Sequence, residues 1–277
     1  MPFTLHDPNM KKIDYPVGIK PLDFLVSSIE KERKSESVEG IPGNIDYGFN
    51  YKDREVTLTF WLRHFYGEYD NRLIKADLYN LLDSEPYFYI SDDRLPSRVL
   101  KVTIDEQYMP ERILHSPFSE LEVKGNVSGL PFWRTRYTTQ EIESSGYSAI
   151  VEKYGMADGI HVDHLKYRYD KNEFTVWNGG NVTVDPRNMK LDIRIAFGTS
   201  KGTVRIDNLT TGEFITFSRP VVNDHLDFFG TKVLLGATNR LRDSNRKFIS
   251  LVPGENKIKI SNIDFRFCTF DFPYYYK

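Results

Sequence analysis

The stretch "GIPGNIDYG", Gly40–Gly48, opens the part of the sequence that decides the fold of the N-terminal half. Its glycine, proline and asparagine residues predict a turn, because they supply the backbone angles that turns require. An alternating strand, "REVTLTFWLR" (Arg54–Arg63), comes next and is followed by a helical segment, "NRLIKADLYNLLDS" (Asn71–Ser84). Two more strands, "YFYISDD" (Tyr87–Asp93) and "SRVLKVTID" (Ser97–Asp105), complete the order turn, strand, helix, strand, strand.

The strand Arg54–Arg63 has a clear period of two. Its apolar side chains on one face are Val56, Leu58, Phe60 and Leu62. This alternation predicts a strand with one buried face. Trp61 lies on the opposite face, which indicates that this face is covered too, by the helix or by a partner.

The segment Asn71–Ser84 has the period of a helix. Asp70 or Asn71 can cap it, and Pro86 ends it. One apolar stripe is formed by Leu73, Ile74, Leu78, Leu81 and Leu82. The remaining positions are largely polar, so we expect this helix to pack one face on a sheet.

Three other segments of the N-terminal part are less regular. A short strand is expected around Phe24–Ile29, and Ile113–Gly129 is expected to be a further hairpin arm. Between the first strand and the turn lies a polar, charged segment, Glu30–Glu39. Its lack of pattern predicts a loop, which is either mobile or an arm. We place the N-terminal domain at 1–130.

The segment 131–170 is expected to be a connection between two domains, of uncertain structure. The sequence "TTQEIESSGYSAIVEKYG" predicts a short helix that is capped at Thr138 or Thr139. Gly146, in the middle of this sequence, weakens the helical pattern.

From Phe174 onward the pattern is that of β-structure, and we place a C-terminal β-sandwich domain at 171–277. "FTVWNGGNVTV" has an Asn-Gly pair between two strand-like runs, which predicts a hairpin. "KLDIRIAFG" alternates, and "GTVRIDNLTTGEFITFSR" predicts a hairpin with its turn at Asn208–Gly212. Short strands at this spacing are typical of a sandwich or barrel, so the fold class of the whole chain is mainly β.

The composition excludes several classes of protein. With 277 residues, 40% of them hydrophobic and 27% charged, the chain is expected to fold into one or two domains with real cores. The net charge of -2 argues against a protein that acts on nucleic acid. No apolar run reaches the roughly 20 residues of a membrane helix, and the first residues do not resemble a signal peptide. We therefore expect assembly in a cytoplasm and no insertion in a membrane.

No residue cluster predicts catalysis, a metal ion or a cofactor. Cys268 lies in a strand-like run, and we expect it to be a small buried side chain. His161, Asp163 and His164 are close in sequence, but a metal site needs more ligands than these, and we expect polar residues at a domain junction. The glycine clusters lack the spacing of a phosphate loop, and no pair of carboxylates is singled out.

Two features have alternative interpretations as binding surfaces. Trp133 and Trp177 are candidates for stacking on sugar rings, although core positions are the better explanation. The basic segment Asn239–Lys247 is either a solvated hairpin loop or a contact patch for an acidic partner.

The chain resembles the distal tail proteins of long-tailed phages that infect Gram-positive bacteria. The first block of similarity is Gly40–Ile104, with the order of elements given above. The second block has the Asn178-Gly179 turn, then Pro186 before a long strand, then Pro253-Gly254 with Asn256, and last the aromatic "FRFCTFDFPYYY". The segment 136–170 matches this family poorly.

The resemblance implies a structural protein of the virion tail tip, without catalytic residues. The N-terminal domain would form a hexameric ring, in which the charged segment Glu30–Glu39 could be an interlocking arm. The C-terminal domain would be a β-sandwich that is galectin-like or similar to a carbohydrate module. The implied partners are the tail tube protein, the tape measure protein, the tail-associated lysin and the receptor-binding protein.

Two alternative functions remain open from the sequence. One is a carbohydrate-binding module or adhesin that uses the C-terminal sandwich. The other is a polysaccharide-degrading enzyme, for which a cleft with two suitably separated carboxylates would be needed.

Overall fold

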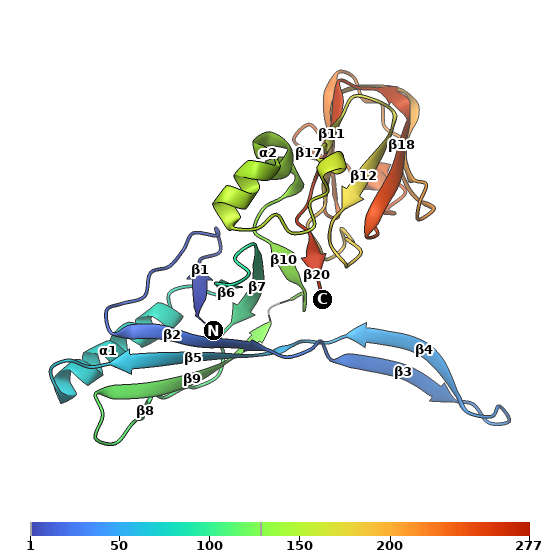
Figure 1. Ribbon diagram of the computed structural model, residues 1–277. Coiled ribbons are helices and arrows are strands. Elements are labelled where there is room, and N and C mark those ends of the chain that lie inside the picture. Colours follow the sequence, from blue (N-terminus) through green and yellow to red (C-terminus); the bar gives the residue numbers. More distant parts are fainter. Residues whose placement is uncertain (1, 128) are drawn as a thin grey trace. The chain divides into compact units, whose positions relative to one another are not determined.

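The computed structural model describes residues 2–127 and 129–277, and its chain divides into two compact units (Figure 1). Unit 1 is Met1–Trp133 and unit 2 is Arg134–Lys277. Met1 and Ser128, which belong to the predicted N-terminal domain, lie outside the described residues. The division at 130 and 170 stays a prediction; most of the segment predicted as a connection is part of unit 2.

Unit 1 is built on one antiparallel sheet with the strand order β1-β6-β7-β9-β5-β2, and the short β8 pairs with β9. The elements of this unit are β1 (Phe3–His6), β2 (Ile19–Val26), β3 (Lys31–Ser37), β4 (Asn44–Tyr51), β5 (Glu55–Arg63), α1 (Glu68–Leu82), β6 (Phe88–Asp92), β7 (Arg98–Thr103), β8 (Glu111–Arg112) and β9 (Phe118–Val127). Every strand predicted in this half is present, with shifted ends.

The alternation of β5 is confirmed, because Val56, Leu58, Phe60 and Leu62 are all buried in the core of unit 1. The strand lies between β9 and β2, so both of its edges are hydrogen-bonded. Trp61, on the other face, is 39% exposed and packs against Phe118 with ring centroids 5.3 Å apart. The apolar period of this strand therefore determines which face of the sheet carries the core.

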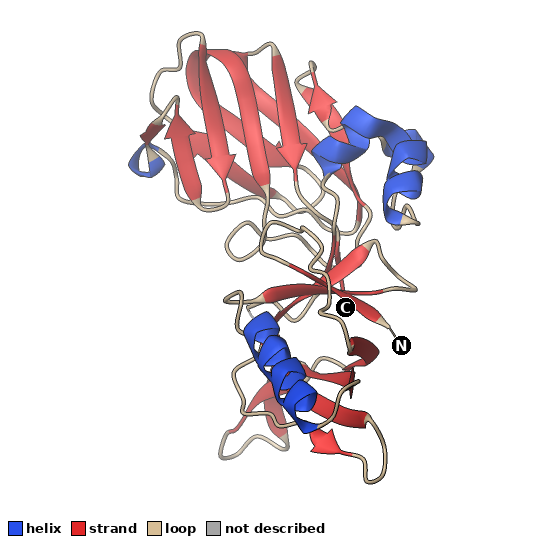
Figure 2. Cartoon of the chain, turned by 90° about the vertical axis from the view of Figure 1, so that its left-hand side faces the viewer, coloured by secondary structure: helices blue, strands red, loops and turns tan. Residues whose placement is uncertain are grey.

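Helix α1 covers the core face of the sheet, as Figure 2 shows, but it starts earlier than the sequence predicts. Its N-cap is Gly67, and neither Asp70 nor Asn71 has that role. The Asp70 carboxylate instead accepts hydrogen bonds from the backbone N–H groups of Phe65 and Tyr66, which precede the helix. An acidic side chain in the first turn can fold back on the entering loop in this way, and it also stabilises the helix dipole.

The apolar stripe of α1 is confirmed at four of its five positions. Buried against the sheet are Ile74, Leu78, Leu81 and Leu82. Leu73 is 65% exposed. The helix thus buries a narrow stripe and leaves one large apolar side chain outside the core.

The polar segment that was predicted as a loop is a strand of a β-hairpin. Strand β3 pairs with β4 from Lys31↔Tyr51 to Ser37↔Asn44 in a separate two-stranded sheet. Figure 1 shows this hairpin extending away from β2 and β5 within unit 1. All residues of β3 are exposed, so nothing in its surroundings imposes an apolar alternation, and the sequence pattern could not reveal a strand.

Unit 2 is a β-sandwich whose two sheets share one long strand. Its elements are β10 (Trp133–Thr135, beginning at the boundary), α2 (Thr139–Tyr154), η1 (Val162–His164), β11 (Arg168–Tyr169), β12 (Glu173–Asn178), β13 (Asp192–Asn208), β14 (Glu213–Phe217), β15 (Asp224–Phe229), β16 (Lys232–Leu235), β17 (Thr238–Asn239), η2 (Leu241–Asp243), β18 (Gly254–Asp264), β19 (Phe267–Asp271) and β20 (Tyr275–Tyr276). The mainly β fold is confirmed.

The shared strand, β13, joins two segments that were predicted as separate strands. Its first half pairs with β15 and β19, and its second half pairs with β14 and β18. The register with β15 shifts between Ile195 and Gly198. Such an irregularity bends a strand and lets one strand pass from one sheet to the other.

The predicted hairpin at Asn178-Gly179 is wrong. Strand β12 ends at Asn178 and pairs with β18, far away in sequence. The Asn178 side chain donates to the carbonyls of Val182 and Leu251, both at 3.0 Å, and accepts from the N–H of Gly180. Asn178 therefore stabilises a buried loop through its side chain. The Asn-Gly pair in this loop is the same pair that is typical of a hairpin turn.

Helix α2, expected near Thr138, is confirmed and is longer than expected. Its N-cap is Thr138, and it continues to Tyr154. Gly146 adopts φ 78° and ψ 168° and divides the helix into two parts. Gly146, which weakened the helical pattern in the sequence, therefore lies at a kink of the helix, because glycine takes this conformation without steric strain.

Cys268 is fully buried in β19, as predicted, and burial raises the pKa of its thiol. Only the thiolate reacts readily with disulfide reagents, and here it is both disfavoured and enclosed. We expect the native protein to react with an aromatic disulfide reagent at least about a thousandfold more slowly than the unfolded chain. Absorbance of the released thiol measures both rates, and rapid reaction of the native protein would contradict this prediction.

Candidate interaction surfaces

Trp133 lies beside the core of unit 1. It is partly buried and packs against the central cluster. Its ring meets that of Phe24 edge to face, with centroids 5.7 Å apart. A sugar ring would have to displace this contact, so sugar binding at Trp133 stays a prediction without support from the local geometry.

Trp177, on β12 of unit 2, is already stacked on another ring. The His164 imidazole lies parallel to the indole, with an interplanar angle of 4° and centroids 5.0 Å apart. His161 packs at 5.1 Å, and the indole N–H donates to the carbonyl of Gly159 at 3.1 Å. The two tryptophans lie in different units, and no shared sugar platform follows from their positions.

His161 is the N-cap of the short helix η1, and His164 is its last residue. His161 Nδ1 accepts a hydrogen bond from the N–H of Asp163, and His164 Nε2 lies 3.5 Å from Glu255 Oε1. Across residues 2–127 and 129–277, no group of three or more histidine, cysteine or acidic residues is arranged to hold a metal ion. These side chains complete the aromatic cluster around Trp177.

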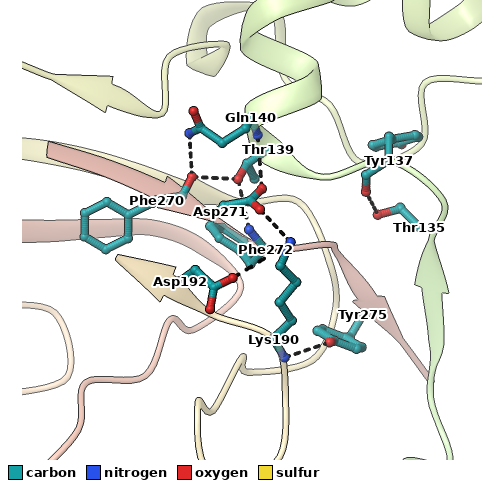
Figure 3. A network of polar contacts seen from close by, with 10 residues as sticks. All are labelled: Thr135, Tyr137, Thr139, Gln140, Lys190, Asp192, Phe270, Asp271, Phe272 and Tyr275. Atoms are coloured by element: carbon teal, nitrogen blue, oxygen red, sulfur yellow. Dashed lines mark hydrogen bonds and ion pairs between the residues drawn. The ribbon is translucent and has the colours of Figure 1, made fainter. Parts of the chain in front are cut away.

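A buried polar network ties the start of unit 2 to the end of the chain (Figure 3). Thr139 Oγ1 donates to the carbonyl of Phe270 at 2.8 Å and accepts from the N–H of Phe272 at 3.1 Å. The Gln140 amide donates to the same Phe270 carbonyl at 2.9 Å. In this way, backbone groups at the end of β19 and just after it find hydrogen-bond partners in side chains.

Next to this network, charged side chains line the outer face of the sheet. Asp192 and Asp271 lie opposite each other on β13 and β19, and Lys190 Nζ is 2.6 Å from an Asp271 oxygen and 3.9 Å from an Asp192 oxygen. Burial, and to a lesser degree the charge of Asp271, raise the pKa of Asp192. Like charges on facing positions destabilise a sheet, so Lys190 offsets a local repulsion and holds the pair in place.

Unit 1 carries an exposed apolar surface around the start of α1, which we call the α1 surface. Its residues are Val17, Phe65, Tyr66, Tyr69 and Leu73. Tyr66 and Tyr69 are 89% and 85% exposed. Gly18, next to Val17, lies against Phe65, so these residues from two segments form one surface. Exposed aromatic groups in one place are typical of protein interfaces.

The β3–β4 hairpin carries a second exposed aromatic surface. Tyr47 is 61% exposed, and Phe49 has the ammonium group of Lys31 over its ring at 4.8 Å. At the base of the hairpin, Tyr51 packs on Phe132 with ring centroids 5.5 Å apart. The hairpin is therefore anchored at its base and presents aromatic and charged groups to the solvent.

Sequence reasoning missed the α1 surface, since it counted Leu73 with the core and took no account of Tyr66 and Tyr69. The available signal was the segment "FYGEY", Phe65–Tyr69, which has three aromatic residues in a region that was not assigned to any strand or helix. For the hairpin, the segment Glu30–Glu39 was identified as a possible arm, but its strand structure was not.

Comparison with known proteins places these surfaces on a phage tail fold. Residues 15–124 match the family described as phage tail protein RIFT-related domain. The whole chain is similar to the crystal structure of Dit (gp 19.1) of phage SPP1, described as a paradigm of the hub adsorption apparatus in phages that infect Gram-positive bacteria. The TM-score is 0.70, at 14% sequence identity over 99% of each chain.

Other comparisons add less. Two structures of the phage P2 baseplate in its activated conformation, one with calcium and one with strontium, give TM-scores of 0.46 and 0.44. Their identities are 10% and 11%, over 99% and 98% of this chain and 97% of theirs. No curated protein sequence matches the chain.

Residues 15–124, in the N-terminal half of the chain, are thus similar to a phage tail domain. Along its whole length the chain has the fold of a distal tail protein, which confirms the resemblance drawn from the sequence. A search of the described helices finds none that is long and apolar enough to cross a membrane.

Proposed function

We propose that this protein is a structural hub of a phage tail tip, and that its work is assembly and not catalysis. The observation that carries this proposal is the phage tail domain at 15–124 within a chain whose complete fold is that of a distal tail protein. The exposed aromatic surfaces of unit 1 support it, because an assembly protein needs contact area.

The hub would be a hexameric ring. A cyclic ring is built from two different surfaces on each subunit, which meet head to tail and close. Unit 1 presents two such surfaces, the β3–β4 hairpin and the α1 surface. We propose that the hairpin is the arm by which one subunit holds the next.

The ring would join the tail tube protein and the tape measure protein to the tail-associated lysin and the receptor-binding protein. Its place would be the virion tail tip, after assembly in the host cytoplasm. The net charge of -2 suits a ring through which DNA passes, because a strongly basic channel would hold the phosphates.

The test is the solution mass of the purified protein, by light scattering after size exclusion over a concentration series, with electron microscopy of the same fractions. We expect a hexamer, or a monomer that becomes a hexamer as the concentration rises, and rings in the images. A monomer at every concentration, without rings in the images, would contradict self-assembly. It would direct attention to glycan binding and hydrolysis, the alternatives that the sequence leaves open.

A further inference from the structure

We propose that a groove beside β14 in unit 2 binds a sugar unit that carries an anionic group. The groove has a volume of about 450 Å³. Its polar lining includes Asp185, Arg187, Glu213, Arg246, Lys247 and Ser250. This volume is in the range of sites for small molecules. The inference does not depend on ring assembly, since none of these residues belongs to unit 1.

Glu213 is a fixed hydrogen-bond acceptor at the groove. Its Oε2 accepts from the N–H of Ser250 at 2.7 Å, from the Ser250 hydroxyl at 2.6 Å and from the Thr211 hydroxyl at 3.1 Å. Among the described residues, its second oxygen, Oε1, has no hydrogen-bond partner. A carboxylate that is held through one oxygen and open at the other is suited to accept hydrogen bonds from the hydroxyl groups of a ligand.

The basic side chains Arg246 and Lys247 give the groove its charge. The Ser244 hydroxyl accepts from the N–H of Arg246, and the Asn245 side chain accepts from the N–H of Lys247, both at 3.1 Å. Arg246 has φ 55°, an uncommon conformation for a residue with a side chain. Within the described residues, neither basic group lies within 4.0 Å of a carboxylate. The Lys247 ammonium lies over the ring of Phe214, 4.9 Å from its centroid, and this contact leaves its charge without a carboxylate partner among the described residues.

The charges of the lining do not cancel. Arg187 is paired with Asp185 through its Nε, which lies 2.9 Å from each carboxylate oxygen. Glu213 offsets one of the two positive charges of Arg246 and Lys247, so the charged lining of the groove has one positive charge in excess. A neutral sugar would leave this charge without a partner, and a simple anion would leave the Glu213 acceptor unsatisfied.

A sugar acid or a sugar phosphate satisfies both requirements at once. Its hydroxyl groups donate to Glu213, and its anionic group meets Arg246 and Lys247. The half-buried ring of Phe248 also lines the groove and supplies an apolar wall for the carbon atoms of the sugar. The sequence marked part of this surface, because Arg246 and Lys247 belong to the basic segment Asn239–Lys247, but Glu213 comes from a different hairpin.

The experiment is a set of calorimetric titrations of the full chain with four probes. The probes are glucuronate, glucose 6-phosphate, glucose and inorganic phosphate. We expect at least one of the two anionic sugars to bind about tenfold more tightly than both glucose and inorganic phosphate. Glucose has no anionic group for Arg246 and Lys247, and inorganic phosphate has no sugar hydroxyl groups for Glu213. Whichever of the two anionic sugars binds more tightly shows whether a carboxylate or a phosphate is the preferred anionic group. Equal binding of inorganic phosphate, or no binding of either anionic sugar, would overturn the proposal.

Variants separate the two halves of the site. Lys247→Gln should weaken the binding of the anionic sugar about tenfold, while Lys171→Gln, which removes an exposed cation outside the groove, should leave it unchanged. Glu213→Gln should reduce the preference for the anionic sugar over inorganic phosphate, because the amide no longer repels a bare anion. Thermal unfolding verifies that each variant is folded. An equal loss in the Lys171 and Lys247 variants would show a non-specific charge effect and overturn the site.

Discussion

Removal of the β3–β4 hairpin is expected to abolish ring formation and leave a folded monomer. The deletion variant lacks residues 32–50 and joins Lys31 to Tyr51 through an Asn-Gly turn. These two residues are paired in the hairpin register, so a tight turn can connect them. Tyr51 and its contact with Phe132 are kept. The removed residues contribute nothing to the buried core of unit 1, so the thermal unfolding midpoint should not change.

The measurement is again light scattering after size exclusion, at a concentration at which we expect the intact protein to be hexameric. A second variant, Tyr47→Ser with Phe49→Ser, keeps the hairpin and removes its exposed aromatic groups; it should weaken assembly, because aromatic residues dominate interface energies. The control is Lys34→Ser, which removes an exposed charge from β3. A deletion variant that still forms hexamers would show that the hairpin is not the arm of the ring.

Arg194→Ala is expected to destabilise unit 2 by about 3 kcal/mol, the largest effect of a single substitution that we expect outside the apolar core. Asp227 has a side chain that is only 4% exposed, and the Arg194 guanidinium holds both of its oxygens, each at 2.9 Å. Without the arginine, a buried carboxylate would lose its charge partner. The value is at the lower end for such a loss because the Arg194 side chain is itself 45% exposed, so water can replace it in part.

Urea denaturation, followed by tyrosine and tryptophan fluorescence, measures this loss. The matched control is Arg205→Ala on the same strand, β13. Arg205 forms a similar ion pair with Asp207, but this pair joins neighbouring positions of one strand, and the Asp207 side chain is more exposed, at 17%. We expect a much smaller effect there. Equal losses in both variants would mean that the burial of Asp227 does not determine the stability.

Local patterns in the sequence were sufficient where one face of a strand or helix is buried. The alternation of β5, the stripe of α1 and the burial of Cys268 were all predicted, because burial imposes a period on the side chains. Strand β3 was not predicted, because all of its residues are exposed. Hydrogen bonding between backbones does not restrict which side chains a strand carries. The Asn178-Gly179 error has a similar origin, because a buried loop and a hairpin turn use the same residues.

By itself, the sequence determined that this protein is mainly β, that it has one long helix in its N-terminal part, and that its elements follow the order of a distal tail protein. These properties depend on residues close together in the chain. Tertiary structure alone decided that β13 passes through both sheets, that Leu73 joins tyrosines at an exposed surface, and that Glu213 lines one groove with Arg246 and Lys247. The physical reason is that strand pairing and the lining of a groove depend on contacts between distant segments, which no local period of side chains encodes.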